Sequence, residues 1–181
     1  MHHWLAVGTV CFALMTVGVT AQTVQPYAGM ETRPIKALSE QQIADLRTGR
    51  GMSLALAAEL NGYPGPRHVL ELADHLNLSP QQLQNVKRLF DEMTVEAVAV
   101  GQTLITQETE LDGQFARRTV SQDSLSSAIA VIGQAQAELR KTHLKYHLLT
   151  TASLTQQQLH RYSQLRGYTG SNQGHGPAHG N

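Results

Sequence analysis

Residues 78–82 read Leu78-Ser79-Pro80-Gln81-Gln82 and combine three signals for the start of a helix. Ser79 suits the N-cap, because its hydroxyl can accept a hydrogen bond from an unpaired amide of the first turn. Pro80 suits the first helical position, where φ is already helical and no N–H is needed. Gln82, three residues after Ser79, can bond back to the cap and complete a capping box. The sequence therefore predicts that a helix starts at Pro80.

Two long apolar stripes follow this start. The first extends to about Asp112 and consists of Leu83, Val86, Phe90, Met93, Ala97, Val100, Leu104 and Leu111. After a turn between Gly113 and Gln122, the second covers Asp123 to Thr150 and consists of Leu125, Ala128, Ile132, Ala135, Leu139 and Tyr146. Such stripes are typical of helices that pack along one face, and a short connection makes two helices antiparallel neighbours. We therefore expect an all-α fold built on a long antiparallel helical hairpin.

Additional short helices are predicted on either side of the hairpin. Three precede it, over residues 39–48, 52–60 and 68–76, and one follows it from Thr155 to about Arg166. The Gly- and Pro-bearing stretch 61–66 forms a corner between the second and third of these helices.

The pattern Leu-Ser/Thr-x-x-Gln of residues 78–82 recurs near both ends of the chain. Leu154, Thr155 and Gln158 carry a second copy, and residues 38–42 carry a third. One copy is simply how many helices begin, whereas two copies that flank a helical hairpin form a narrower pattern. We therefore treat Leu78, Ser79, Gln82 and their counterparts Leu154, Thr155 and Gln158 as one motif set.

This motif set resembles the twin LTxxQ motifs of the Spy/CpxP family of periplasmic helical proteins, which includes stress chaperones and metal-responsive relatives such as ZraP. The resemblance covers roughly Leu78 to Arg166, and Ser79 stands where the family has Thr. It implies a homodimer that forms a thin curved cradle and holds unfolded or aggregation-prone periplasmic proteins without ATP. Docking on a membrane sensor protein is compatible with the same resemblance.

The termini suggest an exported protein. An apolar run and small residues at Val19-Thr20-Ala21 predict a signal peptide over residues 1–21, cleaved after Ala21 into the periplasm. The alternative is an uncleaved anchor, since no Lys or Arg precedes the run. Residues 22–37 are then a flexible tether, 38–166 a single helical domain, and 167–181 a disordered tail bearing Gly and His. The single cysteine, Cys11, lies in the removed segment, so the mature protein would have no disulfide.

Composition excludes several functions. The chain has 14 Lys and Arg against 14 Asp and Glu, so no net field indicates a nucleic-acid partner. No Cys nucleophile, Gly-x-Ser-x-Gly elbow or His-Glu-x-x-His motif is present. We therefore expect no enzymatic activity. The basic end of the second long helix is expected to pair with acids of the first.

His143 and His147 are the best chemical signal in the chain. Four residues apart on one helix, both rings project from the same side and could share a divalent metal such as Zn, Ni or Cu. Two ligands are too few, so a carboxylate or a dimer mate would have to complete the site, and His160 or the tail residues His175 and His179 could contribute. In the alternative interpretation His143 fills a stripe position next to Tyr146 and His147 lies at the surface. The chaperone interpretation requires no cofactor. Met52 and Met93 could provide the protein with an adaptable client-binding surface.

Overall fold

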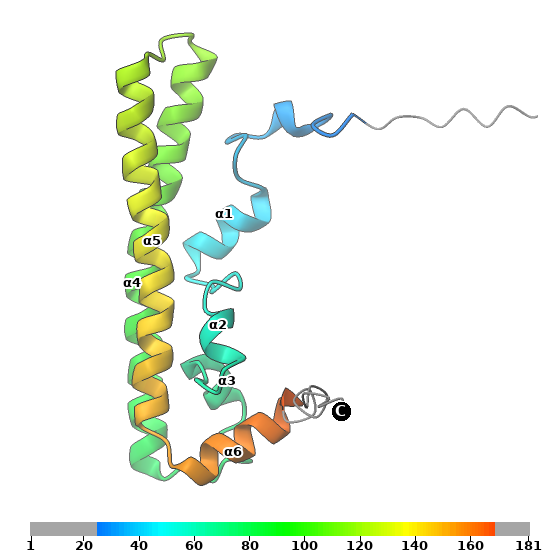
Figure 1. The fold of residues 1–181 in the computed structure, drawn as a ribbon, viewed down its shortest axis with the longest axis vertical. Helices are drawn as coiled ribbons and strands as arrows, with labels where there is room; N and C mark the ends of the chain where they lie inside the picture. The colour runs from blue at the N-terminus through cyan, green and yellow to red at the C-terminus, as the bar shows by residue number, and fades with distance from the viewer. Residues whose placement is uncertain (1–24, 169–181) are drawn as a thin grey trace, which may run out of the picture.

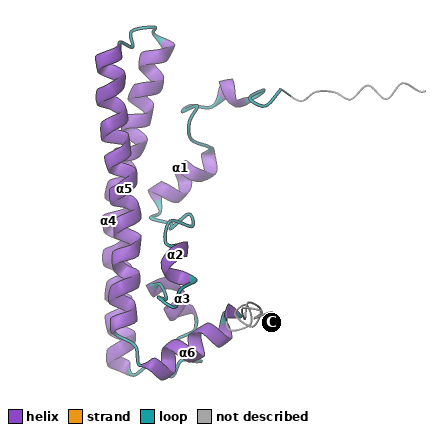
Figure 2. Cartoon of the chain, viewed as in Figure 1, coloured by secondary structure: helices purple, strands orange, loops and turns teal. Residues whose placement is uncertain are grey.

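The computed structural model describes residues 25–168, and every regular element in this range is helical (Figure 2). A 3-10 helix, η1 (Met30–Thr32), is followed by α1 (Glu40–Arg47), α2 (Leu56–Glu59), α3 (Pro66–Glu71), α4 (Pro80–Ala116), α5 (Gln122–Ala152) and α6 (Gln156–Leu165). The predicted all-α class is confirmed. Within residues 25–168 no helix has the length and apolarity needed to cross a membrane.

Helices α4 and α5 lie antiparallel and form a long hairpin, and the shorter helices lie along one side of it (Figure 1). The predicted end of α4 near Asp112 is wrong, because the helix continues through Gly113 to Ala116. Glycine is only about 1 kcal/mol worse than alanine inside a helix, and Leu111 packs against the core beside it. The turn comes at Arg118, which adopts φ 55°, and Ser121 then caps α5 by accepting a hydrogen bond from the Ser124 amide.

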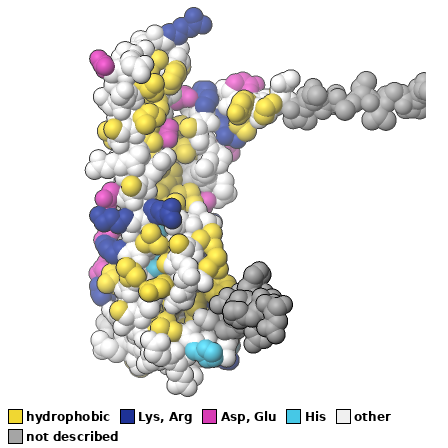
Figure 3. Space-filling model, in the orientation of Figure 1, with side chains coloured by type: hydrophobic (Ala, Val, Ile, Leu, Met, Phe, Trp, Pro, Cys, Tyr) yellow, Lys and Arg dark blue, Asp and Glu magenta, His cyan; other side chains and the backbone are white. Residues whose placement is uncertain are grey.

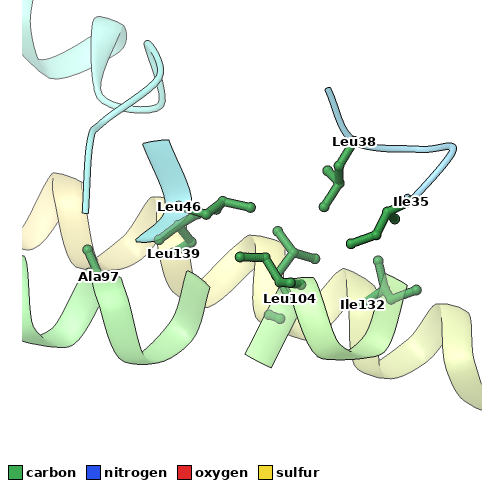
Figure 4. Close-up of a cluster of buried hydrophobic side chains, with 9 residues drawn as sticks. Ile35, Leu38, Leu46, Ala97, Leu104, Ile132 and Leu139 are labelled. Atoms are coloured by element: carbon green, nitrogen blue, oxygen red, sulfur yellow. The ribbon is translucent and has the colours of Figure 1, made fainter. Parts of the chain in front are cut away.

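The largest core cluster lies where α1 crosses the hairpin. Figure 4 shows side chains of α1, of the segment before it, and of α4 and α5 converging there; the labelled residues are Ile35, Leu38, Leu46, Ala97, Leu104, Ile132 and Leu139. Helix α1 approaches α4 closely at Gly101, where an added Cβ would lie 2.7 Å from the Leu46 carbonyl oxygen. Glycine at this position therefore lets the backbone of α1 contact the backbone of α4.

The segment predicted to be a tether contributes to this core. Ile35 is only 5% exposed, and the Lys36 ammonium lies 3.2 Å from the Asp112 carboxylate near the far end of α4. The part of the segment next to α1 is thus packed on the hairpin. The predicted signal peptide and the tail from residue 169 onward lie outside the described residues.

Two of the predicted short helices are much shorter in the structure. Of residues 52–60, only α2 is helical, because Met52 and Ser53 have φ of 42° and 64°. The tight turn lets Met52 and Leu54 both contact the core of the hairpin, which a continuous helix would prevent. Helix α3 begins earlier than predicted, at Pro66, and ends at Glu71 rather than Leu76.

The charge pairing predicted between the two long helices is present. The Lys145 ammonium lies 2.7 Å from the Glu96 carboxylate, and the Tyr146 hydroxyl donates to the same carboxylate at 2.8 Å. These hydrogen bonds, from Lys145 first and Tyr146 second, lower the pKa of Glu96. Exposed pairs of this kind contribute at most about 1 kcal/mol, so they adjust the register of a hairpin held by its apolar stripe.

Candidate binding site

The two Leu-Ser/Thr-x-x-Gln motifs meet at the end of the hairpin where α4 begins and α5 ends. The Ser79 hydroxyl accepts from the Gln82 amide and the Thr155 hydroxyl accepts from the Gln158 amide, and each glutamine side chain bonds back to its own cap. The two side-chain amides also bond to each other, from Gln82 Nε2 to Gln158 Oε1 at 2.9 Å and in the reverse direction at 3.1 Å. Leu78 and Leu154 pack on the cluster around buried Tyr162. The motifs therefore build a structural junction.

A buried carboxylate lies above this junction. Glu59 at the end of α2 is 8% exposed and accepts hydrogen bonds at Oε1 from the hydroxyls of Tyr162 and Tyr168. Its Oε2 accepts from the Gly65 amide at 3.3 Å, and the Arg166 guanidinium lies 3.7 Å from Oε1. Burial first, and the hydrogen bond to Glu59 second, raise the pKa of Tyr162. The tyrosine therefore keeps its proton and donates to the acid.

An open cavity of about 390 Å³ lies beside Glu59, between the N-terminal segment and the hairpin. Met52 and Leu56 line it from the N-terminal side, and Phe90 and Met93 line it from α4. Figure 3 shows hydrophobic side chains gathered on the face of the molecule where the short helices pack on the hairpin. A cavity that combines apolar walls with a few polar groups is the usual form of a ligand site.

Both predicted metal-site histidines line this cavity. His143 is buried, at 3% exposure, and its Nε2 has no hydrogen-bond partner among residues 25–168. Burial, and secondarily the charge of His147, lower the pKa of His143. The ring is therefore neutral at physiological pH. The expectation that His143 fills a stripe position next to Tyr146 agrees with its burial, whereas the expectation that His147 lies at the surface is wrong, because its side chain is only 11% exposed.

His147 is held in place by the corner that precedes α3. Its Nδ1 lies 2.6 Å from the Tyr63 carbonyl oxygen and 3.8 Å from Oε2 of Glu59. Its Nε2 lies against Gly65, where an added Cβ would be only 2.6 Å away. Nδ1 is thus occupied by the Tyr63 carbonyl, whereas Nε2 only lies in close contact with Gly65. In the described part of the chain no three His, Cys, Asp or Glu side chains are arranged to hold a metal ion.

Of the other histidines considered for this site, the structure describes His160 alone, which does not join it. His160 is exposed on α6, where its Nε2 lies 2.9 Å from the Gln164 amide nitrogen, and it does not line the cavity. His175 and His179 lie outside the described residues.

Sequence reasoning missed Glu59, which lies in the stretch 54–60, Leu-Ala-Leu-Ala-Ala-Glu-Leu. A single acid in such an apolar stretch is a signal that a carboxylate is to be buried with partners. Those partners could not be read from the pattern, because Tyr162 lies 103 residues further along the chain.

Comparison of the chain with protein-family models, with curated proteins and with solved structures yields no match.

Proposed function

We propose that this chain is an exported, ATP-independent chaperone-like protein that binds apolar segments of unfolded or aggregation-prone clients in the periplasm. The observation that supports it is the open cavity beside α2, with apolar side chains left exposed at its rim. Because the twin motifs resemble those of the Spy/CpxP family, we further propose that the protein forms a homodimer that can also dock on a membrane sensor.

The rim has the chemistry that a client-binding surface needs. Leu56 lines the cavity and is 45% exposed, and Leu60, one turn further along, is 58% exposed. Residues four apart lie on the same side of a helical turn, so the two leucines extend the apolar wall outward. Met52 and Met93 add flexible, polarisable side chains that adapt to different partners. Together these groups favour contact with varied apolar segments over one fixed ligand shape.

Aggregation of a chemically denatured client, followed by light scattering, tests the proposal. The mature protein is expected to suppress scattering near equimolar ratio, without ATP and equally with and without EDTA. The double variant Leu56→Ser/Leu60→Ser should lose most of this effect, because it removes the apolar rim. Ile129→Ser is the matched control, since Ile129 is 53% exposed on α5 but lies 14 residues, or about 21 Å, from His143. Equal suppression by both variants would refute the rim as the client site.

A divalent-metal site is the second candidate, favoured by one observation: His143, His147 and Glu59 line the same cavity. Binding of Zn, Ni or Cu would use Nε2 of His147, with Nδ1 kept on the Tyr63 carbonyl as is usual for metal-bound histidines, and would require Glu59 to exchange one of its donors. Isothermal titration of the mature protein with each metal tests this. A micromolar isotherm that is abolished by His147→Ala, together with no effect on client aggregation, would favour the metal function over the chaperone function.

A further inference from the structure

The charged side chains that line the cavity already have partners. Arg67 lies 3.0 Å from Glu71, Arg50 lies 3.7 Å from Asp45, and Glu59 is surrounded by the donors described above. A charged ligand would therefore compete with a pair that the protein already makes. His143 differs from these groups, because its Nε2 is buried and lacks a partner among the described residues. The cavity is thus suited to an uncharged ligand.

The orientation of His143 determines which polar group the ligand should carry. Its Nδ1 and Cε1 face Gly51 at the cavity wall, 3.7 and 3.8 Å from the position of a Cβ added there. A proton on Nε2 would be a buried N–H with no acceptor, which is rarer and more costly than an unpaired acceptor. The favoured tautomer of the neutral ring therefore carries its proton on Nδ1, where it can donate toward the cavity. An oxygen atom of a ligand could then accept a hydrogen bond from Nδ1–H.

The walls favour an aromatic ring next to that oxygen. Phe90 offers a ring, and Met52 and Met93 offer thioethers, which make favourable contacts with aromatic rings. A dry cavity of about 150 Å³ holds benzene. The present cavity, at about 390 Å³, has room for a ring together with the chain to which it is attached.

We propose that the cavity takes a phenol ring, the side chain of a tyrosine in a bound polypeptide, whose oxygen accepts a hydrogen bond from Nδ1–H of His143. This inference rests on the proposed function and names the client side chain that the cavity selects. Phenylalanine fills the same space but leaves His143 without a partner. Tyrosine segments are therefore bound in preference to otherwise identical phenylalanine segments.

The first test uses two probes of nearly equal shape, p-cresol and toluene, titrated into the full-length protein and followed by NMR. We expect the ratio of the toluene Kd to the p-cresol Kd to fall about tenfold in His143→Phe, because the variant loses the one hydrogen bond that distinguishes the two probes. Addition of p-cresol, but not of toluene, should also shift the His143 Nδ1 proton resonance. A ratio unchanged by the substitution overturns the proposal.

A second variant keeps the proposal testable if His143→Phe does not fold. An alanine at Gly51 places its Cβ in ordinary contact with His143 Nδ1, at 3.7 Å, so the fold should tolerate it while the imidazole edge is covered. Gly51→Ala should therefore reduce the p-cresol preference as well. Gly133→Ala is the control, because an added Cβ there meets nothing within 4 Å. Retention of the full preference in Gly51→Ala overturns the proposal.

A peptide pair separates this inference from the proposed function. Two peptides that differ only in one Tyr or Phe are titrated into the wild-type protein. Tighter binding of the Tyr peptide, lost in Gly51→Ala, supports the inference. Equal binding of both peptides overturns the tyrosine preference and leaves client binding intact. Binding of p-cresol with neither peptide bound overturns client binding and, with it, the assignment of the phenol ring to a bound polypeptide.

Discussion

The side-chain amides of Gln82 and Gln158, 76 residues apart in sequence, hydrogen-bond to each other in both directions. Each also closes its own capping box, and each reaches a backbone carbonyl beyond it, that of Ser153 for Gln82 and that of Leu76 for Gln158. The start of α4, the end of α5 and the start of α6 are therefore joined by two residues. A motif that looks like local capping chemistry in the sequence acts as a tertiary contact.

A double-mutant cycle on this pair should reveal coupling. Gln82→Ala and Gln158→Ala each remove a capping bond and leave partly buried amide partners unpaired, so each is expected to lower the free energy of unfolding by about 1–2 kcal/mol. Because they share two hydrogen bonds, the double variant should deviate from additivity by at least about 0.5 kcal/mol. Urea denaturation measures all four states. Gln42→Ala, from the third motif copy, is the control and should combine additively with Gln158→Ala.

The caps themselves give a simpler test. Ser79→Ala and Thr155→Ala each remove the acceptor for an amide of the first turn, so each should lower the free energy of unfolding by about 1 kcal/mol, with the smaller effect at Thr155. Thermal unfolding followed by circular dichroism provides the measurement. An unchanged melting temperature in both variants would show that these hydroxyls do not stabilise the helix starts.

Two glycines on the hairpin should respond in opposite directions to the same substitution. An alanine Cβ at Gly101 would lie 2.7 Å from the Leu46 carbonyl oxygen, so α1 must shift and the free energy of unfolding should fall by about 1–3 kcal/mol. At Gly133, an exposed position inside α5, nothing lies within 4 Å of the added Cβ. There Gly133→Ala should stabilise by about 0.5–1 kcal/mol. Equal effects in urea denaturation would contradict the close approach of α1 to α4.

The hairpin and its caps could be predicted because their signals are local. Spacings of three and four place Val86, Met93 and Ala97 on the buried face of α4, and all three are buried. Leu89 and Ile105 are buried as well but lie outside that regular stripe. They became core residues because α1, α3 and α5 cover α4 from more than one side.

The N-terminal segment resisted prediction because distant contacts decide its conformation. Residues 52–60 favour a helix by composition, yet Met52 and Ser53 adopt left-handed backbone angles so that Met52 can contact the core of the hairpin. His143 and His147 were placed on one side of α5 by their spacing alone. The neighbours of His147 are Glu59 and the corner at Tyr63, which precede it by more than 80 residues and could not be read from the sequence.

Removal of the Glu59 charge should weaken the contact between α2 and α6. Glu59→Gln keeps the shape of the side chain but loses the charge-assisted hydrogen bonds from Tyr162 and Tyr168, and we expect a loss of about 1.5–3 kcal/mol in the free energy of unfolding. Tyr162→Phe should cost a similar amount, because it leaves a carboxylate oxygen short of a donor. Arg67→Gln, which breaks only the exposed pair with Glu71, is the control and should cost less than about 1 kcal/mol. A Glu59→Gln effect no larger than the control would refute a stabilising role for the buried acid.

The burial of His143 should make stability depend on pH. In the unfolded chain its imidazole has a pKa near 6.5, whereas burial and the neighbouring His147 lower the pKa of His143 in the fold. Between these two values the unfolded chain binds a proton that the folded chain does not, so the free energy of unfolding falls as the pH drops below about 6.5. The slope from this one group cannot exceed about 1.4 kcal/mol per pH unit. The lowered pKa values of Glu71 and Glu96 change the free energy of unfolding only below the unfolded pKa of 4.5, outside this range.

Urea denaturation from about pH 8 to about pH 5.5 should therefore show the loss in the wild type and in the exposed control His160→Asn, and a smaller loss in His143→Phe. A wild-type profile that is flat across this range would mean that His143 is protonated as easily in the fold as in the unfolded chain.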